Sequence, residues 1–158
     1  MRIIGCGNRE RMDDGAGILV VQRVCSLGVN AAIHSGEAAA LIEAWSGADD
    51  VIIVDTVVSG APTGTVHTWD SRQPLPLPTS PASTHGLGVA EAVELAGALG
   101  RLPRRLRVYG IEGRQFDFGY NLSPEVRLAV RAVIRQILTL VHTDLADGRS
   151  EPARLSSE

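Results

Sequence analysis

The run Val51-Ile52-Ile53-Val54 constrains the fold more than any other stretch of the sequence. Every residue in it is apolar and branched at Cβ, and such residues favour strands. A strand with one face in water alternates apolar and polar residues, whereas this run is apolar throughout. It therefore predicts a strand that is covered on both faces, as in the middle of a parallel sheet.

Weaker strand patterns alternate along the chain with patterns of helical period. We predict strands at residues 2–6, 31–34, 51–54, 65–69 and 106–111, and helices at residues 18–27, 37–45, 87–99 and 124–142. Strands that alternate with helices predict an α/β fold, here a three-layer sandwich of a mostly parallel five-stranded sheet with helices on both faces. The strand at residues 65–69 is expected to pair back near the strand that precedes it.

The length of 158 residues suits one domain with a substantial core. We assign residues 1–143 to this domain and residues 144–158, where the sequence turns polar, to a flexible C-terminal tail. The formal net charge is -3, and no cluster of Lys and Arg is paired with stacking aromatic residues. This composition argues against a nucleic-acid partner.

The sequence contains no apolar run long enough to span a bilayer, and its first residues lack the apolar region of a signal peptide. We therefore expect no membrane association and a cytoplasmic location. Cys6 and Cys25 are the only cysteines, and in a reducing compartment they are not expected to form a disulfide.

A glycine-rich stretch from Gly5 to Gly17 joins the first predicted strand to the first predicted helix. Its glycines allow a sharp turn and a close approach of the backbone to a partner. Asp13 and Asp14 lie where the helix begins, and a helix N-terminus favours negative charge. Two interpretations stay open for this stretch alone, because the acids can bind a metal or can simply cap the helix.

Two further residues favour a site. Asp55 ends the central apolar run, and His85 lies just before the helical pattern that begins at Leu87. In parallel sheets, sites form outside the carboxyl ends of the strands, where Asp14 and Asp55 are placed. Two carboxylates and one imidazole, with positions left for water or substrate, suit nickel, zinc or a similar ion.

Other chemistries fit less well. A dinucleotide fingerprint would need a third glycine where Glu10 stands, and an acid at the end of the second strand, where His34 stands. Cys6 lies near the predicted site, but a small buried cysteine is the commoner explanation for it. No G-x-S-x-G elbow is present.

An ordered set of motifs runs through residues 2 to 142. It consists of Gly5-x-Gly7-Asn8-x4-Asp13-Asp14-Gly15-x-Gly17, Val54-Asp55-Thr56, Thr84-His85-Gly86-Leu87, Gly110-Ile111-Glu112-Gly113 and Leu122-Ser123-Pro124-Glu125. This set resembles the hydrogenase maturation endopeptidases, which trim the C-terminal tail of the large subunit of [NiFe] hydrogenase. The resemblance implies an α/β fold with a twisted, mostly parallel central sheet.

The resemblance also implies roles for three residues. Asp14, Asp55 and His85 would contact a metal and carry out the cleavage, and the metal would be the nickel already loaded in the precursor rather than an ion held permanently. The implied partner is the precursor of the hydrogenase large subunit, and we expect the free protein to be a monomer. A free carboxylate oxygen can then act as base. The alternative is a non-catalytic, nickel-sensing module that binds the precursor without cutting it.

Two positions depart from the pattern. Relatives often carry an acid three residues after the strand-ending one, where this chain has Val58, and an Asp at the end of strand two, where it has His34. His34 can therefore be an extra polar neighbour of the site or only a surface residue. The proline-rich loop at residues 73–81 and the aromatic segment at residues 115–120 are candidates for gripping the precursor.

Overall fold

The computed structural model describes residues 1–71, 73 and 87–146. Within this part of the chain the strands are β1 (Arg2–Cys6), β2 (Ala31–His34), β3 (Asp50–Val57), β4 (Val66–Asp70) and β5 (Arg105–Glu112). The helices are α1 (Ala16–Ser26), α2 (Ala38–Trp45), α3 (Leu87–Ala98) and α4 (Pro124–Ala146), and a short 3-10 helix, η1 (Met12–Gly15), precedes α1.

The strands form one five-stranded sheet in the order β2-β1-β3-β5-β4. The pairs β1–β2, β1–β3 and β3–β5 are parallel, and only β4 pairs antiparallel, with β5. The predicted α/β sandwich with a mostly parallel sheet is therefore confirmed. β3 lies at the centre of the sheet, as its apolar run requires.

The predicted neighbour of β4 was wrong, because β5 lies between β3 and β4. β3 is apolar on both faces and needs a strand on each side, and β5 pairs with it over its whole length from Asp50 to Val57. β4 exposes His67 and Thr68 to solvent. A strand with that pattern suits the edge of a sheet better than a place beside the central strand.

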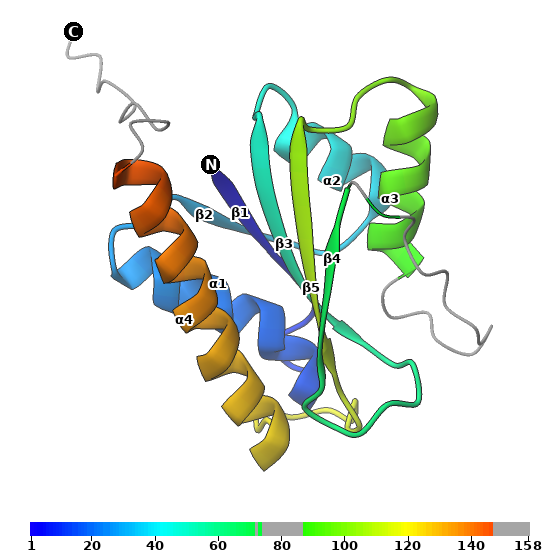
Figure 1. Cartoon of the computed structure of the whole chain (residues 1–158). Coiled ribbons are helices and arrows are strands. Elements are labelled where there is room, and N and C mark those ends of the chain that lie inside the picture. Colours follow the sequence, from blue (N-terminus) through cyan, green and yellow to red (C-terminus); the bar gives the residue numbers. More distant parts are fainter. Residues whose placement is uncertain (72, 74–86, 147–158) are drawn as a thin grey trace, which may run out of the picture.

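The helices lie in two layers, with α1 and α4 on one face of the sheet and α2 and α3 on the other (Figure 1). β3 contributes to both cores, because Ile52 and Val54 pack with α1 and α4 while Val51 and Ile53 pack with α2 and α3. This double coverage is what the continuous apolar run predicted.

Two boundaries differ from the predictions in ways that matter. Asp55 does not end its strand, because β3 continues to Val57, which pairs with Glu112 of β5. α4 extends to Ala146, beyond the predicted domain end at residue 143. The rest of the predicted tail, residues 147–158, lies outside the described residues.

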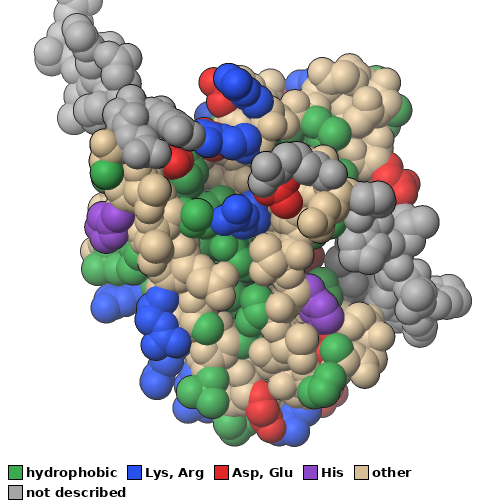
Figure 2. All heavy atoms as spheres, in the orientation of Figure 1, with side chains coloured by type: hydrophobic (Ala, Val, Ile, Leu, Met, Phe, Trp, Pro, Cys, Tyr) green, Lys and Arg blue, Asp and Glu red, His purple; other side chains and the backbone are tan. Residues whose placement is uncertain are grey.

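The outer side of α4 carries the exposed residues Arg127, Arg131 and Arg135. Figure 2 shows basic side chains over this helix. They are spaced four residues apart and so form one stripe on the helix surface. Because they have no aromatic residues among them, the expectation that the protein has no nucleic-acid partner stays unchanged.

Candidate active site

The glycine-rich turn packs tightly against the ends of β1 and β3. A Cβ atom on Gly17 would lie 2.4 Å from the carbonyl oxygen of Val54 and 2.5 Å from that of Cys6, so α1 touches both strands directly. Gly7 has φ +124°, and a Cβ there would lie 1.9 Å from the carbonyl oxygen of Asp14. Only glycine fits at these positions, which explains why the turn is so rich in it.

Asp14 is held inside this turn and is 6% exposed. The backbone N–H of Asn8 donates to the Oδ2 atom of Asp14 at 3.0 Å, and the same N–H lies 3.2 Å from the carbonyl oxygen of Asp14. The side chain therefore has a fixed place at the carboxyl end of β1, where the sequence placed it.

Asp55 lies within β3 and is 7% exposed. Its Oδ1 atom accepts a hydrogen bond of 2.8 Å from the backbone N–H of Thr56. Burial is the main cause that raises the pKa of Asp55, and the nearby charge of Asp14 adds to it, while the Thr56 hydrogen bond opposes both. Together they bring the pKa of Asp55 to about 7. The two acids that the sequence selected therefore lie close enough to repel each other.

Cys6 belongs to the same neighbourhood. Burial, followed by the charges of Asp55 and Asp14, raises the pKa of its thiol. A thiol that stays protonated is a poor nucleophile and a poor metal ligand. The structure thus agrees with the interpretation of Cys6 as a small buried residue.

A divalent cation fits the two carboxylates electrostatically. Two buried carboxylates side by side are costly when both are charged, and a cation between them would remove that cost. Among residues 1–71, 73 and 87–146, no three His, Cys, Asp or Glu side chains are grouped so that they could hold a metal ion. The predicted third ligand, His85, lies outside the described residues.

Asp13 has a role that the sequence analysis missed. It is fully buried, and its carboxylate accepts hydrogen bonds from Arg114 N (3.0 Å), Gln115 N (3.0 Å), Ser123 N (2.6 Å) and Ser123 Oγ (2.8 Å). Burial raises the pKa of Asp13, but these hydrogen bonds outweigh it and leave the pKa below its usual value. Asp13 is therefore a structural anchor next to Asp14 rather than a second ligand.

The backbone of Asp13 also connects the turn to β3. The hydroxyl of Thr56 donates to the carbonyl oxygen of Asp13 at 2.8 Å. Thr56 follows Asp55, and Asp13 precedes Asp14, so this hydrogen bond sets the spacing of the two site residues. No sequence signal marked it, because the partners are 43 positions apart.

His34 lies at the end of β2 and pairs in register with Cys6 of β1. β1 in turn pairs with β3 up to Gly5 and Val54, so His34 is two strands away from Asp55. Neighbouring strands are about 4.8 Å apart, which puts the backbone of His34 about 10 Å from that of Asp55. His34 borders the site, and its role there stays a prediction.

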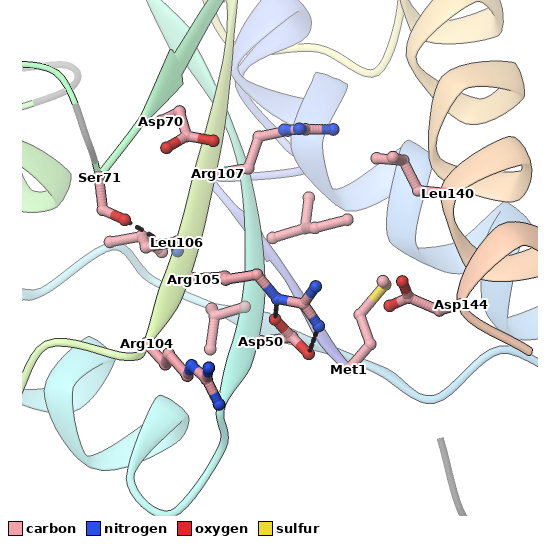
Figure 3. Close-up of a pocket in the computed structure, with 12 residues that line it drawn as sticks. Met1, Asp50, Asp70, Ser71, Arg104, Arg105, Leu106, Arg107, Leu140 and Asp144 are labelled. Atoms are coloured by element: carbon pink, nitrogen blue, oxygen red, sulfur yellow. Dashed lines mark hydrogen bonds and ion pairs between the residues drawn. The ribbon is translucent and has the colours of Figure 1, made fainter. Parts of the chain in front are cut away.

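A cavity of about 320 Å³ lies at the opposite edge of the sheet, where β3 and β5 begin (Figure 3). Its lining includes Met1, Asp50, Arg105, Arg107 and Asp144. Arg105 is paired with Asp50 through two hydrogen bonds, as the dashed lines in Figure 3 show. The acids and arginines of this cavity balance each other, and it contains neither Asp14 nor Asp55, so it is separate from the candidate site.

Comparison with known proteins agrees with the resemblance found in the sequence. The family model of hydrogenase maturation proteases matches residues 35–140, a range that contains Asp55 and His85 but not Asp14. The hydrogenase expression/formation protein HupD of Thiocapsa roseopersicina is 29% identical over 143 residues, which cover 86% of this chain and 65% of HupD. The chain thus spans about two thirds of the length of that curated relative.

Two solved structures resemble the fold closely. The [NiFe] hydrogenase maturation protease HybD of Thermococcus kodakarensis superposes with a TM-score of 0.67 and 25% identity, over 88% of this chain and 97% of that one. The hydrogenase maturating endopeptidase HybD of E. coli superposes with a TM-score of 0.73 and 22% identity, over 90% and 92% of the two chains.

Proposed function

Since this chain belongs to the hydrogenase maturation protease family, we propose that it is an endopeptidase that removes the C-terminal extension of a [NiFe] hydrogenase large-subunit precursor. The nickel in this proposal is part of the substrate, loaded in the precursor before cleavage. The observation that carries the proposal is the pair of buried carboxylates, Asp14 and Asp55, at the carboxyl edge of the sheet.

Asp14, Asp55 and His85 are the residues that we propose to contact the nickel of the precursor. The short stretch of chain between His85 and Gly88 allows His85 to reach the two acids. A Cβ on Gly88 of α3 would lie 1.9 Å from the carbonyl oxygen of Gly36, and one on Gly36 would lie 3.7 Å from the Cβ of Cys6. His85 is three residues before Gly88, and three residues of chain span at most about 11 Å.

Asp14, Asp55 and His85 would hold the nickel of the precursor as a recognition element, and a nickel ion that also acts in the cleavage would supply Lewis-acid chemistry. Asp55 is the candidate for the base, since an oxygen of its carboxylate that does not contact the nickel can accept a proton. Asp14, fixed by Asn8, would orient the precursor.

The aromatic segment at residues 115–120 is a proposed grip for the precursor. Phe118 is 78% exposed and Tyr120 is 55% exposed. The segment is joined to the site turn, because Met12 N donates to Gly119 O at 2.8 Å and the Arg11 guanidinium donates to Phe116 O. The other predicted grip, the proline-rich loop, lies outside the described residues apart from Gln73.

The alternative, a nickel-sensing module that binds the precursor without cutting it, is not favoured by membership of a family of proteases. In the described part of the chain, no helix is long and apolar enough to cross a membrane. A cytoplasmic location and a monomeric free protein remain part of the proposal. Analytical ultracentrifugation of the purified protein tests whether the free protein is a monomer.

Incubation of the protein with a nickel-loaded precursor is expected to release a short C-terminal peptide, and the nickel-free precursor is expected to stay intact. His85→Ala should lower the cleavage rate by about 100-fold or more, because it removes one of the three contacts to nickel. Mass spectrometry of the reaction measures both the peptide and its rate of release.

His142→Ala is the matched control, since His142 is exposed on α4. It should cleave at the wild-type rate. Stable complex formation without any released peptide would favour the non-catalytic module, and full activity of His85→Ala would remove His85 from the site.

A further inference from the structure

Three polar side chains outside the nickel site meet at the carboxyl edge of the sheet. The carboxylate of Glu112, at the end of β5, is 2% exposed. Its Oε1 atom accepts hydrogen bonds from Ser59 N (2.8 Å) and Gly60 N (3.0 Å), and its Oε2 atom accepts one from Ser59 Oγ (2.8 Å). The same Oε2 atom lies 3.1 Å from Nε2 of His67. The buried carboxylate thus serves as the acceptor for all these donors.

The cluster contains a hydroxyl, an imidazole and a carboxylate, but it is not a nucleophilic triad. In a triad the imidazole contacts the acid through one nitrogen and the hydroxyl through the other. Here Nε2 of His67 faces both Glu112 and Ser59 Oγ, the latter at 3.4 Å. The hydroxyl donates to Glu112 instead, so no base among the described residues takes the proton of the Ser59 hydroxyl.

The nitrogen of His67 that this cluster leaves unused is Nδ1. Because Glu112 can only accept, Nε2 of His67 must carry the proton, and Nδ1 of the neutral ring is then an acceptor. A carboxylate that accepts from one nitrogen of a histidine fixes the tautomer and the orientation of the ring, as it does for histidines that bind a metal through the other nitrogen. The side chain of His67 is 43% exposed, so a ligand can reach it.

His67 and Asp55 lie in one row across the sheet. Gly110 of β5 pairs with Asp55 on one side and with His67 on the other. Residues in one row point to the same face, and two strand spacings separate their Cα atoms by about 10 Å. Gly110 places no side chain between them. An extended peptide covers this distance in about three residues.

We propose that His67 contacts the precursor segment bound beside Asp55, with Nδ1 accepting a hydrogen bond from that segment, and that Glu112 is the positioning residue for the imidazole. The ligand is an extended peptide that offers an N–H donor. This inference rests on the proposed function, which supplies the peptide and its place at Asp55.

Two substitutions of His67 separate the contact with substrate from the contact with Glu112. His67→Gln keeps an amide donor near the position of Nε2 and removes Nδ1. His67→Asn keeps a polar atom near the position of Nδ1 and removes the donor to Glu112. Ser59→Ala removes the hydroxyl that donates to Glu112, together with its longer contacts of 3.4 Å to Nε2 of His67 and to Ala61 N, but it keeps the imidazole and its contact with Glu112.

We expect His67→Gln to keep the wild-type melting temperature, to raise KM for the precursor about tenfold and to leave kcat nearly unchanged, as for the loss of one binding contact. His67→Asn is expected to melt at a lower temperature. Ser59→Ala and the exposed control His142→Gln should keep the wild-type KM. A role limited to holding the loop at Ser59 and Gly60 would instead leave His67→Gln unchanged in every measurement.

A wild-type KM in His67→Gln overturns the inference while the proposed function stands. If the wild-type protein itself releases no peptide, the proposed function fails, and precursor binding measured by calorimetry decides about His67. Binding that is about tenfold weaker in His67→Gln than in the wild type then supports the contact, and equal binding overturns it.

Discussion

Asp55→Asn is expected to raise the free energy of unfolding of the metal-free protein by about 2–4 kcal/mol near pH 8. The same variant should cleave the precursor about 1,000-fold more slowly. Both effects have one cause, because the charged carboxylate that the proposed reaction uses is costly to bury in the folded protein. Urea unfolding in the presence of a chelator measures the first effect, and the peptide-release assay measures the second.

The pH dependence of stability follows from the direction of this shift. The pKa of Asp55 rises from 3.8 in the unfolded chain to about 7 in the folded protein. Between these values the folded state binds the proton more tightly, so the contribution of Asp55 to stability falls as pH rises from about 4 to 7 and then levels off. Asparagine does not titrate, and the variant should lack this part of the pH dependence.

Asp49→Asn is the matched control, since Asp49 is exposed at the opposite end of β3. It should change neither the stability near pH 8 nor the cleavage rate. An Asp55→Asn protein that loses stability between about pH 4 and 7 as steeply as the wild type would show that Asp55 is not the group responsible.

The sequence predicted the elements that are determined by residues close together in the chain. The run at residues 51–54 identified the central strand, and the acids at strand ends were placed on one sheet edge because parallel strands share that edge. The burial of Asp55 could not be predicted, since it depends on the continuation of β3 to Val57 beside β5. The position of β4 beside β5 likewise depends on tertiary packing, which decides whether a strand lies at the edge or at the centre of the sheet.

The hydrogen-bonded anchors were also beyond sequence reasoning. Asp13 binds Ser123, 110 positions away, and Glu112 binds His67, 45 positions away. Local periodicity carries no information about such pairs, because packing of distant segments creates them. Asp13 and Asp14 look alike in the sequence, yet one is saturated with donors while the other faces a second carboxylate.

Asp13→Ala is expected to lower the free energy of unfolding by about 3–5 kcal/mol, a large part of the stability of a domain of this size. The substitution removes an acceptor that serves three backbone N–H groups and one hydroxyl. It leaves the two Ser123 donors without this partner in a buried place and the Arg114 and Gln115 N–H groups without it in a half-buried one. Because the folded pKa of Asp13 is below its unfolded value of 3.8, the stabilisation is present above that pH and is lost as pH falls through the folded pKa.

Asp13→Asn tests whether the acceptor or the volume is responsible. An amide has nearly the same shape, but its NH₂ group would face backbone N–H donors, so the cost should remain close to that of alanine. Asp117→Asn, at an exposed acid in the same connecting segment, should be neutral. If Asp13→Asn instead unfolds like the wild type, the carboxylate is not what joins the site turn to residues 114–123, and the fixed position of Asp14 would need another cause.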